Sequence, residues 1–319
     1  MEKRVLITGA NGQLGTEITM ALRKHPRVER LIATDIALPN QILQQGEFLP
    51  LDVCNREQLA AIIQEHKINE IIHLAAYLSA KAEGAALAAW DLNMNGLLNV
   101  LEVARTHTSV RQIFWPSSIA VFGPDARATV TLQSAPTNPT TVYGISKVAG
   151  EQWASYYTHK HGVDIRSLRY PGLISYQTLP GGGTTDYAVE IFHSAVKGEI
   201  YSCFLRENTT LPMMYMPDAV RAAIELMDAP AEDISVRTSY NLTAMSFSPA
   251  QLAAAIANRV PGFEVMYRPD ARQNIAETWP SYIDDAVARR DWGWSPVYSL
   301  DDMVADMLQH LQELSTNPE

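Results

Sequence analysis

Cysteine is scarce in this sequence, which has only Cys54 and Cys203 among 319 residues. The two lie far apart in apolar-flanked positions, so a disulfide framework is not expected. A structural zinc site needs several cysteine or histidine ligands at short spacing. The closest histidines, His159 and His161, would point to different sides of a helix. We therefore predict neither disulfides nor a metal site.

Basic runs and long apolar runs are also missing. The formal net charge is −10, which argues against nucleic acid or an anionic membrane surface as a partner. No run of about eighteen apolar residues, as a membrane span requires, occurs. The apolar stretch that begins at Val5 is too short for a signal peptide. We predict a cytoplasmic protein.

Strand-like and helix-like patterns alternate in the first half of the chain. Short β-branched runs predict strands at Arg4–Thr8, Leu31–Asp35, Glu47–Leu51, Glu70–Leu74, Gln112–Pro116 and Asp164–Arg169. Amphipathic patterns predict helices at Gln13–Lys24, Arg56–His66, Asn95–Arg105 and Tyr143–His161. The alternation predicts an α/β fold with a doubly wound, mostly parallel Rossmann sheet. Ligands of such sheets bind beyond the carboxyl ends of the strands.

The pattern loosens after Pro171. Short strands are predicted at Ile200–Leu205 and Tyr240–Leu242, and helices ending near Lys197 and at Pro217–Met227, Pro249–Arg259, Ile283–Asp291 and Asp301–Leu314. No linker composition separates the two halves, so they should pack directly on each other. We predict a sheet domain over residues 1–170 and a smaller C-terminal α/β lobe over 171–319, with parts of about 200–245 returning to the sheet domain.

A glycine-rich turn follows the first predicted strand and begins the first predicted helix. Gly9, Gly12 and Gly15 permit a tight turn and a close approach of the backbone to a pyrophosphate. Asp35 ends the next strand 20 residues after Gly15, where an acid bonds a ribose 2′-hydroxyl and repels a 2′-phosphate. These paired signals predict NAD rather than NADP. The residues predicted to share the turn are Asn11, Gln13 and Leu14.

The ends of the next two strands are predicted to complete the dinucleotide site. Asp52 offers a carboxylate for an adenine amino group, and the small Ala75 and Ala76 let the cofactor approach. Val53 and Leu74 belong to the same strand ends. We assign these residues to the site because they follow strands whose carboxyl ends meet at one edge of the sheet.

Tyr143 and Lys147 lie four residues apart, on one face of a predicted helix. A free phenol has a pKa near ~10 and is a poor base at neutral pH. A neighbouring ammonium favours the phenolate and lowers that pKa. The pair is therefore predicted to move a proton on or off an alcohol.

Together with the Asp52-Val53 pair, Asn93 and Ser118, these residues resemble the extended short-chain dehydrogenase/reductases, a superfamily of NAD-dependent dehydrogenases, epimerases and dehydratases. The resemblance covers essentially the whole chain. It implies that Ser118, 25 residues before Tyr143, forms a catalytic group with Tyr143 and Lys147. The adjacent Ser117 stays open as a rival hydroxyl donor. Cofactor contacts are implied for Asn93, through a water relay to the lysine, and for Tyr143, Lys147, Tyr170 and Leu173.

Four longer strings are more specific than the glycine turn. They are Arg169-Tyr-Pro-Gly-Leu-Ile-Ser175, Pro180-Gly-Gly-Gly-Thr-Thr-Asp-Tyr-Ala-Val189, Thr210-Leu-Pro-Met-Met-Tyr-Met-Pro-Asp218 and Asp291-Trp-Gly-Trp294. They resemble the short-chain type of L-threonine 3-dehydrogenases. The resemblance implies NAD-dependent oxidation of the β-hydroxyl of L-threonine to 2-amino-3-oxobutanoate in threonine catabolism, with Tyr143 as base. It also implies a homodimer formed through the helices Asn95–Arg105 and Tyr143–His161.

The segment Gly181–Thr185 suits the carboxylate of such a substrate. Its backbone N–H groups and two hydroxyls precede a predicted helix, which makes an anion site. One threonine is expected to cap this helix while Asp186 complements the helix dipole. Ser79 is placed to reach the same carboxylate, and Trp279 to close the pocket. The substrate residues predicted are Ser79, Ser118, Tyr143, Gly183, Thr184, Thr185, Asp186 and Trp279.

Two other functions remain open. A sugar-nucleotide epimerase or dehydratase of the same superfamily would retain its cofactor through the cycle and need cations for a substrate pyrophosphate. A non-catalytic NAD-sensing protein would have no need of the placed Tyr143 and Lys147. Net accumulation of NADH with L-threonine separates both from the dehydrogenase.

Overall fold

Six parallel strands form the central sheet, in the order β3-β2-β1-β4-β5-β7. The structure, a computed structural model, describes residues 2–128, 130–179 and 181–316, so Pro180 of the string quoted above lies outside it. The strand order reverses between β1 and β4, where the ligands of such sheets bind. The predicted fold class is confirmed. The strands are β1 Lys3–Thr8, β2 Val28–Asp35, β3 Phe48–Pro50, β4 Glu70–His73, β5 Gln112–Phe114 and β7 Asp164–Arg166.

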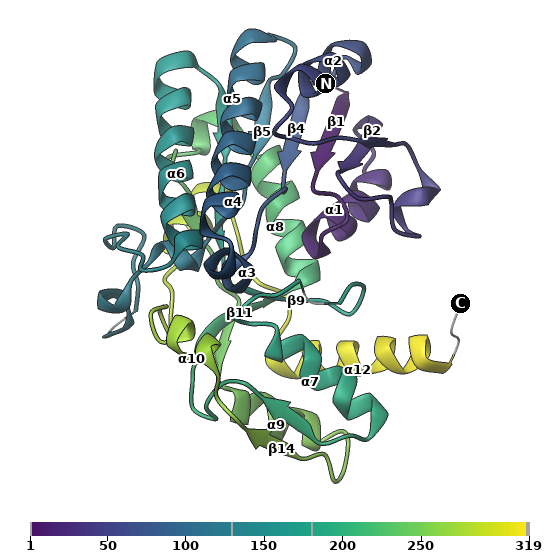
Figure 1. Cartoon of the computed structure of the whole chain (residues 1–319), viewed down its shortest axis with the longest axis vertical. Helices are drawn as coiled ribbons and strands as arrows, with labels where there is room; N and C mark the ends of the chain where they lie inside the picture. Colours follow the sequence, from purple (N-terminus) through teal and green to yellow (C-terminus); the bar gives the residue numbers. More distant parts are fainter. Residues whose placement is uncertain (1, 129, 180, 317–319) are drawn as a thin grey trace.

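Helices cover both faces of this sheet (Figure 1). Successive strand residues point to opposite faces, so Ile71 packs with α2 (Arg56–His66), α5 (Gly96–Thr106) and α6 (Val142–His161). The next residue, Ile72, packs with α1 (Gln13–Arg23) and α8 (Met216–Asp228). The sheet is therefore buried on both sides, which leaves its strand ends as the open edge.

Two predicted strands end early at this edge. The run Gln112–Pro116 stops at Phe114, and the run Asp164–Arg169 divides at Ser167. Pro116 has no N–H to continue the ladder. The chain beyond it forms a separate parallel sheet of β6 (Ser117–Ser118), β8 (Leu168–Tyr170) and β12 (Tyr240–Asn241). This small sheet fixes the position of the serine pair.

A smaller lobe lies beyond the strand ends, at the bottom of Figure 1. Its helices share one hydrophobic cluster with its strands. The strands are β9 Gly172–Ile174, β11 Leu211–Tyr215 and β13 Met245–Phe247 in one mixed sheet, and β10 Tyr201–Cys203 with β14 Val265–Tyr267 in a parallel pair. The helices are α7 Tyr187–Lys197, α9 Pro249–Ala257, α10 Ala271–Ala276 and α12 Leu300–Thr316.

Several short elements have no counterpart in the sequence prediction. The strands β9, β11 and β14 span three to five residues, too few for a clear alternation. The helices α3 (Ser79–Gly84) and α4 (Ala86–Trp90) and the π-helical turn Asp91–Asn95 lack side-chain N-caps. The helix predicted from Ile283 begins only at Ala286, as α11 (Ala286–Trp292), because Ile283 forms a β-bridge with Thr131.

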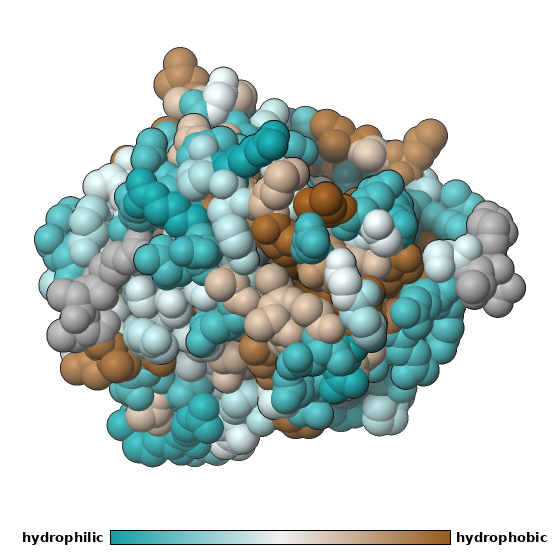
Figure 2. Space-filling view, turned by 90° about the horizontal axis from the view of Figure 1, so that it is seen from below, coloured by the Kyte–Doolittle hydropathy of each residue, from teal (hydrophilic) through white to brown (hydrophobic). Residues whose placement is uncertain are grey.

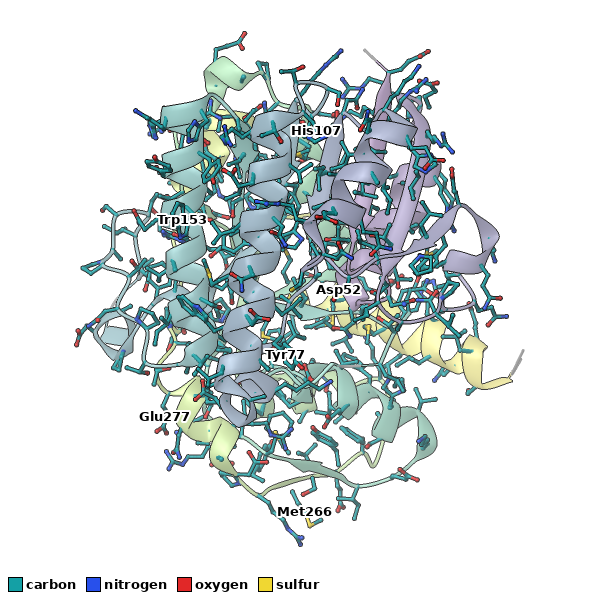
Figure 3. All side chains as sticks on the ribbon, turned by 45° about the horizontal axis from the view of Figure 1, so that its top comes forward. Asp52, Tyr77, His107, Trp153, Met266 and Glu277 are labelled. Atoms are coloured by element: carbon teal, nitrogen blue, oxygen red, sulfur yellow. The ribbon has the colours of Figure 1, made fainter. Side chains whose placement is uncertain are left out.

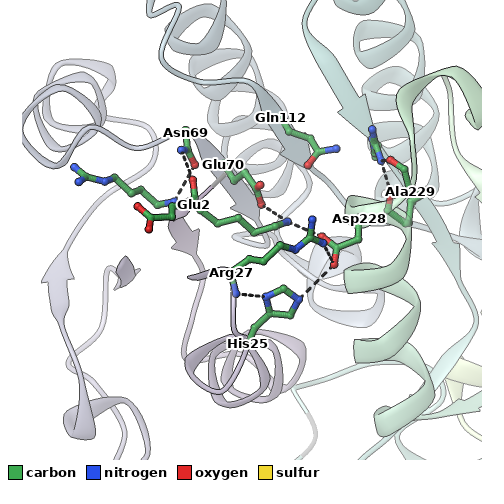
Figure 4. A network of polar contacts seen from close by, with 12 residues as sticks. Glu2, His25, Arg27, Asn69, Glu70, Gln112, Asp228 and Ala229 are labelled. Carbon is green, nitrogen blue, oxygen red and sulfur yellow. Dashed lines mark hydrogen bonds and ion pairs between the residues drawn. The ribbon is translucent and has the colours of Figure 1, made fainter. Parts of the chain in front are cut away.

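An ion network ties β1 to the end of α8 (Figure 4). The Lys3 ammonium lies 3.0 Å from Glu70 and 2.8 Å from Asp228, and Arg27 pairs with the same aspartate. Burial alone would raise the pKa of Asp228, but Lys3 and Arg27 lower it below its ordinary value. The carboxylate therefore stays charged at neutral pH and fastens the helix to the sheet.

Among the described residues, no helix is long and apolar enough to cross a membrane. The face of the molecule seen from below carries scattered apolar side chains among polar ones (Figure 2). No single apolar surface dominates that face.

Candidate active site

A cavity of about 730 Å³ lies where the strand ends meet the smaller lobe. Figure 3 places Asp52 and Tyr77, both lining residues, at this level of the molecule. The cavity brings together almost every residue predicted from the sequence. These are Gly9, Asn11, Gly12, Gln13, Leu14, Gly15, Asp35, Asp52, Val53, Leu74, Ala75, Ala76, Ser79, Ser117, Ser118, Tyr143, Lys147, Tyr170, Leu173, Gly183, Thr184, Thr185, Asp186 and Trp279.

Asn93 is the predicted contact that lies outside the lining. Its side-chain oxygen accepts a hydrogen bond from the Tyr77 backbone N–H at 2.8 Å, and its amide donates to the Ser146 hydroxyl at 3.1 Å. Asn93 is buried in the π-helical turn. It thus joins α6 to the segment after β4 from behind the cavity.

The glycine turn is shaped for close approach. Gly9 has a positive φ of 69°, and a Cβ at this position would lie 2.5 Å from the Ala75 backbone nitrogen. Only glycine fits between these two strand ends. The turn leads directly into α1, whose N-cap, Gly12, makes no side-chain cap. The first N–H groups of the helix therefore lie beside the cavity without a side-chain cap, as a phosphate site requires.

Asp35 stands at the end of β2, next to this turn. Its two carboxylate oxygens accept hydrogen bonds from the backbone N–H groups of Asn11 and Ala37, each at 3.0 Å. These bonds fix the carboxylate in the cavity wall, one strand away from the glycine turn. The residues present therefore fit a dinucleotide.

Ser118, Tyr143 and Lys147 meet at the other end of the cavity. The Ser118 hydroxyl is hydrogen-bonded to the Tyr143 phenol. The Lys147 ammonium donates to the Pro116 carbonyl at 2.6 Å and lies 5.4 Å from the centroid of the Tyr143 ring. One helical turn of α6 thus presents a phenol and a cation to the same strand-end loop.

The pKa of Tyr143 departs from the prediction. Burial raises it to about 12, although the Ser118 hydrogen bond lowers it. Burial also lowers the pKa of Lys147 to about 7, against an opposing effect of Glu151. The sequence predicted that Lys147 would lower the phenol's pKa. In the structure the pKa of the phenol is raised instead of lowered, because burial disfavours its charged form.

Ser117 turns away from this group, into a buried ion pair. Its hydroxyl donates to Glu151 at 2.6 Å, and the same carboxylate accepts from Arg169 at 2.9 and 2.7 Å. Arg169 also donates to Asn241 on β12 at 3.0 Å. Both serines line the cavity, and the Ser118 hydroxyl is the one that lowers the pKa of Tyr143, which favours Ser118 as the hydroxyl donor.

The glycine-rich loop faces the segment after β4. The Ser79 hydroxyl lies 3.2 Å from the Thr184 hydroxyl and accepts from the Thr184 N–H. Neither threonine caps α7, contrary to the prediction. The N-cap is Asp186, whose carboxylate folds back to accept from the Gly182 and Gly183 N–H groups. Those two backbone donors are therefore occupied by Asp186, which leaves the Ser79 and Thr184 hydroxyls as polar groups of this part of the cavity.

Trp279 closes this corner. It is 4% exposed and lines the cavity, and among the described residues its indole N–H has no hydrogen-bond partner. The sequence prediction did not name several other lining residues as site residues. They are Thr8, Ile36, Leu51, Tyr77, Leu78, Lys81, Leu92, Pro116, Ile119, Pro171, Gly172, Thr178 and Leu179. Glu151 was missed too, although its position four residues after Lys147 was a usable signal.

The described residues contain no cluster of three or more His, Cys, Asp and Glu side chains suited to a metal ion.

The glycine turn, the strand-end carboxylate and the Ser-Tyr-Lys group define a Rossmann-type, dinucleotide-dependent oxidoreductase. Residues 5–243 match the family described as the NAD dependent epimerase/dehydratase family. The match spans most of the chain, which therefore belongs to this family.

Individual proteins and solved structures provide a closer comparison than the family as a whole. An uncharacterized epimerase/dehydratase of Staphylococcus haemolyticus is 46% identical over 318 residues, covering 99% of each chain. The solved structure of a GalE-like L-threonine dehydrogenase from Cupriavidus necator, in its holo form, has a TM-score of 0.94 at 55% identity, covering 97% of this chain and 99% of that one. A monomeric L-threonine 3-dehydrogenase from a metagenome has a TM-score of 0.93 at 45% identity, with coverage of 97% and 99%.

Proposed function

We propose that this protein oxidises the β-hydroxyl of L-threonine with NAD⁺, giving 2-amino-3-oxobutanoate in threonine catabolism. The observation that carries the proposal is that the Ser118–Tyr143–Lys147 group shares one cavity with the Ser79–Thr184 contact. The first holds and deprotonates an alcohol, and the second suits a carboxylate. The likeness to enzymes named L-threonine dehydrogenase supports this substrate.

The dinucleotide would be held by its pyrophosphate at the Gly9–Gly15 turn and by a ribose at Asp35. Asp52 would bond the adenine, and Asp35 would repel the 2′-phosphate of NADP. When bound, NAD⁺ supplies a hydride acceptor and a positively charged ring. The protein's part is to orient the β-carbon, exclude water and manage one proton.

Tyr143 takes that proton in the proposed mechanism. Ser118 holds the substrate hydroxyl while the phenolate oxygen of Tyr143 accepts its proton. Lys147, fixed by the Pro116 carbonyl, compensates the phenolate charge. Microscopic reversal gives the same residues the role of acid in the reduction.

The division into domains belongs to the proposal. Residues 1–170 would bind the dinucleotide and residues 171–319 mainly the substrate, with parts of 200–245 in the sheet domain. The pairing of β12 with β8 and the packing of α8 on the sheet support the return of that segment. Cys54 and Cys203 are free thiols, which supports a reducing, cytoplasmic location.

A homodimer through α5 and α6 is also proposed. Helix α6 exposes Ile145, Trp153 and Tyr156, and neighbouring α4 exposes Leu87 and Trp90. Large apolar side chains in solvent favour a partner surface.

The decisive test follows NADH absorbance with L-threonine, other β-hydroxy amino acids and sugar nucleotides. We expect NADH to accumulate with L-threonine. In the variant Tyr143→Phe the rate should fall about 10²–10⁴-fold, while NAD binding is retained. Conversion of a sugar nucleotide without net NADH would identify an epimerase instead. NAD binding without turnover of any alcohol would identify a sensing protein, and a fully active Tyr143→Phe would refute the base.

A further inference from the structure

Lys81 is a cation of the cavity to which the mechanism above gives no role. It lies on α3, two residues after Ser79, and it lines the cavity. Only two lining residues are basic, Lys81 and Lys147, among the residues that the structure describes. Lys147 is buried and already holds the Pro116 carbonyl. Lys81 is exposed, and within the described part of the chain it makes no ion pair.

The glycine-rich loop is built around the stem of this lysine. Gly182 has a φ of 98°, and a Cβ there would lie 3.0 to 3.3 Å from the Cε, Cγ and Cδ of Lys81. Glycine therefore allows the aliphatic stem to lie along the loop backbone. The Ser79 hydroxyl, two residues before Lys81, and the Thr184 hydroxyl, two residues after Gly182, lie 3.2 Å apart. The stem of Lys81 thus lies against the loop that carries Thr184, and both residues line the same cavity.

The charges of this corner match a zwitterion. Asp186 lies in the same wall, but its carboxylate accepts from the Gly182 and Gly183 N–H groups and not from Lys81. One cation and one anion therefore stand apart at a single end of the cavity. An α-amino acid carries the complementary pair, a carboxylate and an ammonium.

We propose that Lys81 binds the α-carboxylate of the substrate and makes the site selective for free α-amino acids. This inference rests on the proposed function and adds the group that recognises the substrate's charge. A charge-assisted hydrogen bond joins the ammonium to a carboxylate oxygen. An uncharged carboxamide at the same place cannot form an ion pair.

The test compares L-threonine with L-threoninamide, which keeps the ammonium and the β-hydroxyl. Lys81→Met preserves the length of the side chain and removes its charge. We expect KM for L-threonine to rise about tenfold, since hydrogen bonds to charged groups have that magnitude, with kcat within twofold. The rate of Lys81→Met with L-threoninamide should stay within twofold of that of the unmodified protein. The preference for L-threonine over L-threoninamide should therefore fall about tenfold. Lys81→Arg should restore most of it.

Lys197→Met is the matched control, because Lys197 is exposed on α7 of the same lobe and outside the cavity lining. It removes the same charge and should leave both substrates unchanged. Equal behaviour of the Lys81→Met and Lys197→Met variants would overturn the role of Lys81, as would an equal loss with both substrates. If the unmodified protein forms no NADH from L-threonine, the proposed function itself fails, and this inference with it.

Discussion

At the scale of single residues, we expect Tyr143 and Lys147 to titrate as one unit, because the Lys147 ammonium lies 5.4 Å from the centroid of the Tyr143 ring. Burial places the pKa of the phenol at about 12 and that of the ammonium at about 7. The species that can accept a substrate proton carries one proton fewer than the fully protonated pair. Loss of that first proton is governed by the lower value, whichever of the two residues finally gives up the proton.

This coupling predicts how activity depends on pH. We expect kcat/KM to rise as the pH increases through about 7 and then to level off, because the active pair forms above the pKa of Lys147. In Lys147→Met the phenol titrates alone, so activity should keep rising about tenfold per pH unit up to pH 9. Lys147→Arg serves as the charge-retaining control. A Lys147→Met profile that levels off near pH 7 would contradict the coupling.

Alanine substitutions of the two adjacent serines should have different effects, one on kcat and the other on stability. Ser118→Ala removes the hydroxyl bonded to Tyr143 and should lower kcat about 10²-fold, with little change in stability. Ser117→Ala takes a donor from buried Glu151 and should lower the free energy of unfolding by about 1–3 kcal/mol. Its kcat should fall far less. Turnover assays and urea unfolding of both variants measure the difference, and a reversed order would exchange their roles.

At the scale of elements, α6 organises the site. Thr141 caps its first turn, Gly162 ends it in a left-handed conformation, and Tyr143, Lys147 and Glu151 follow at intervals of four residues. Side chains at this spacing lie on one face. The same face therefore delivers the phenol, the ammonium and the carboxylate that anchors the strand-end loop through Ser117.

Removing that anchor should cost much stability. Glu151→Ala leaves the Arg169 guanidinium buried without its counter-charge, which costs about 3–5 kcal/mol. The control is Glu47→Ala, which breaks the half-exposed pair with Arg30 and should cost less than about 1 kcal/mol. Urea unfolding of both variants without cofactor measures the contrast. Equal losses would show that the buried pair is dispensable.

At the scale of the whole molecule, the cavity exists only because the lobe meets the sheet edge. Gln13 on α1 donates to the Thr178 carbonyl at 3.0 Å, and the Ser175 hydroxyl donates to Glu17 at 2.7 Å. These bonds join the first helix to the chain entering the lobe. Each wall of the cavity therefore comes from a different part of the sequence.

The exposed aromatic side chains on the outer side of α6 lead us to expect a homodimer. Trp153 projects there, 40% exposed, beside Tyr156 (Figure 3). We expect sedimentation velocity to give twice the chain mass for the unmodified protein, and Trp153→Glu to give a monomer, because a charge in an apolar interface is unfavourable. Lys160→Glu, a charge change at an exposed position near the end of the same helix, is the control. A monomeric unmodified protein, as in the metagenomic relative, would rule the dimer out.

The sequence alone was sufficient for the sheet, its major helices and the list of residues that could meet at the strand ends. Periodicity and turn chemistry are local, and parallel strands bring their carboxyl ends to one edge. Tertiary structure decided what those residues do. Burial raised the pKa of Tyr143, where the sequence predicted a lower value. The Ser117 hydroxyl donates a hydrogen bond to Glu151, and the N–H groups of the glycine-rich loop donate to Asp186. No sequence motif predicts that Lys81 lines the cavity, because its position depends on a loop about a hundred residues later in the chain.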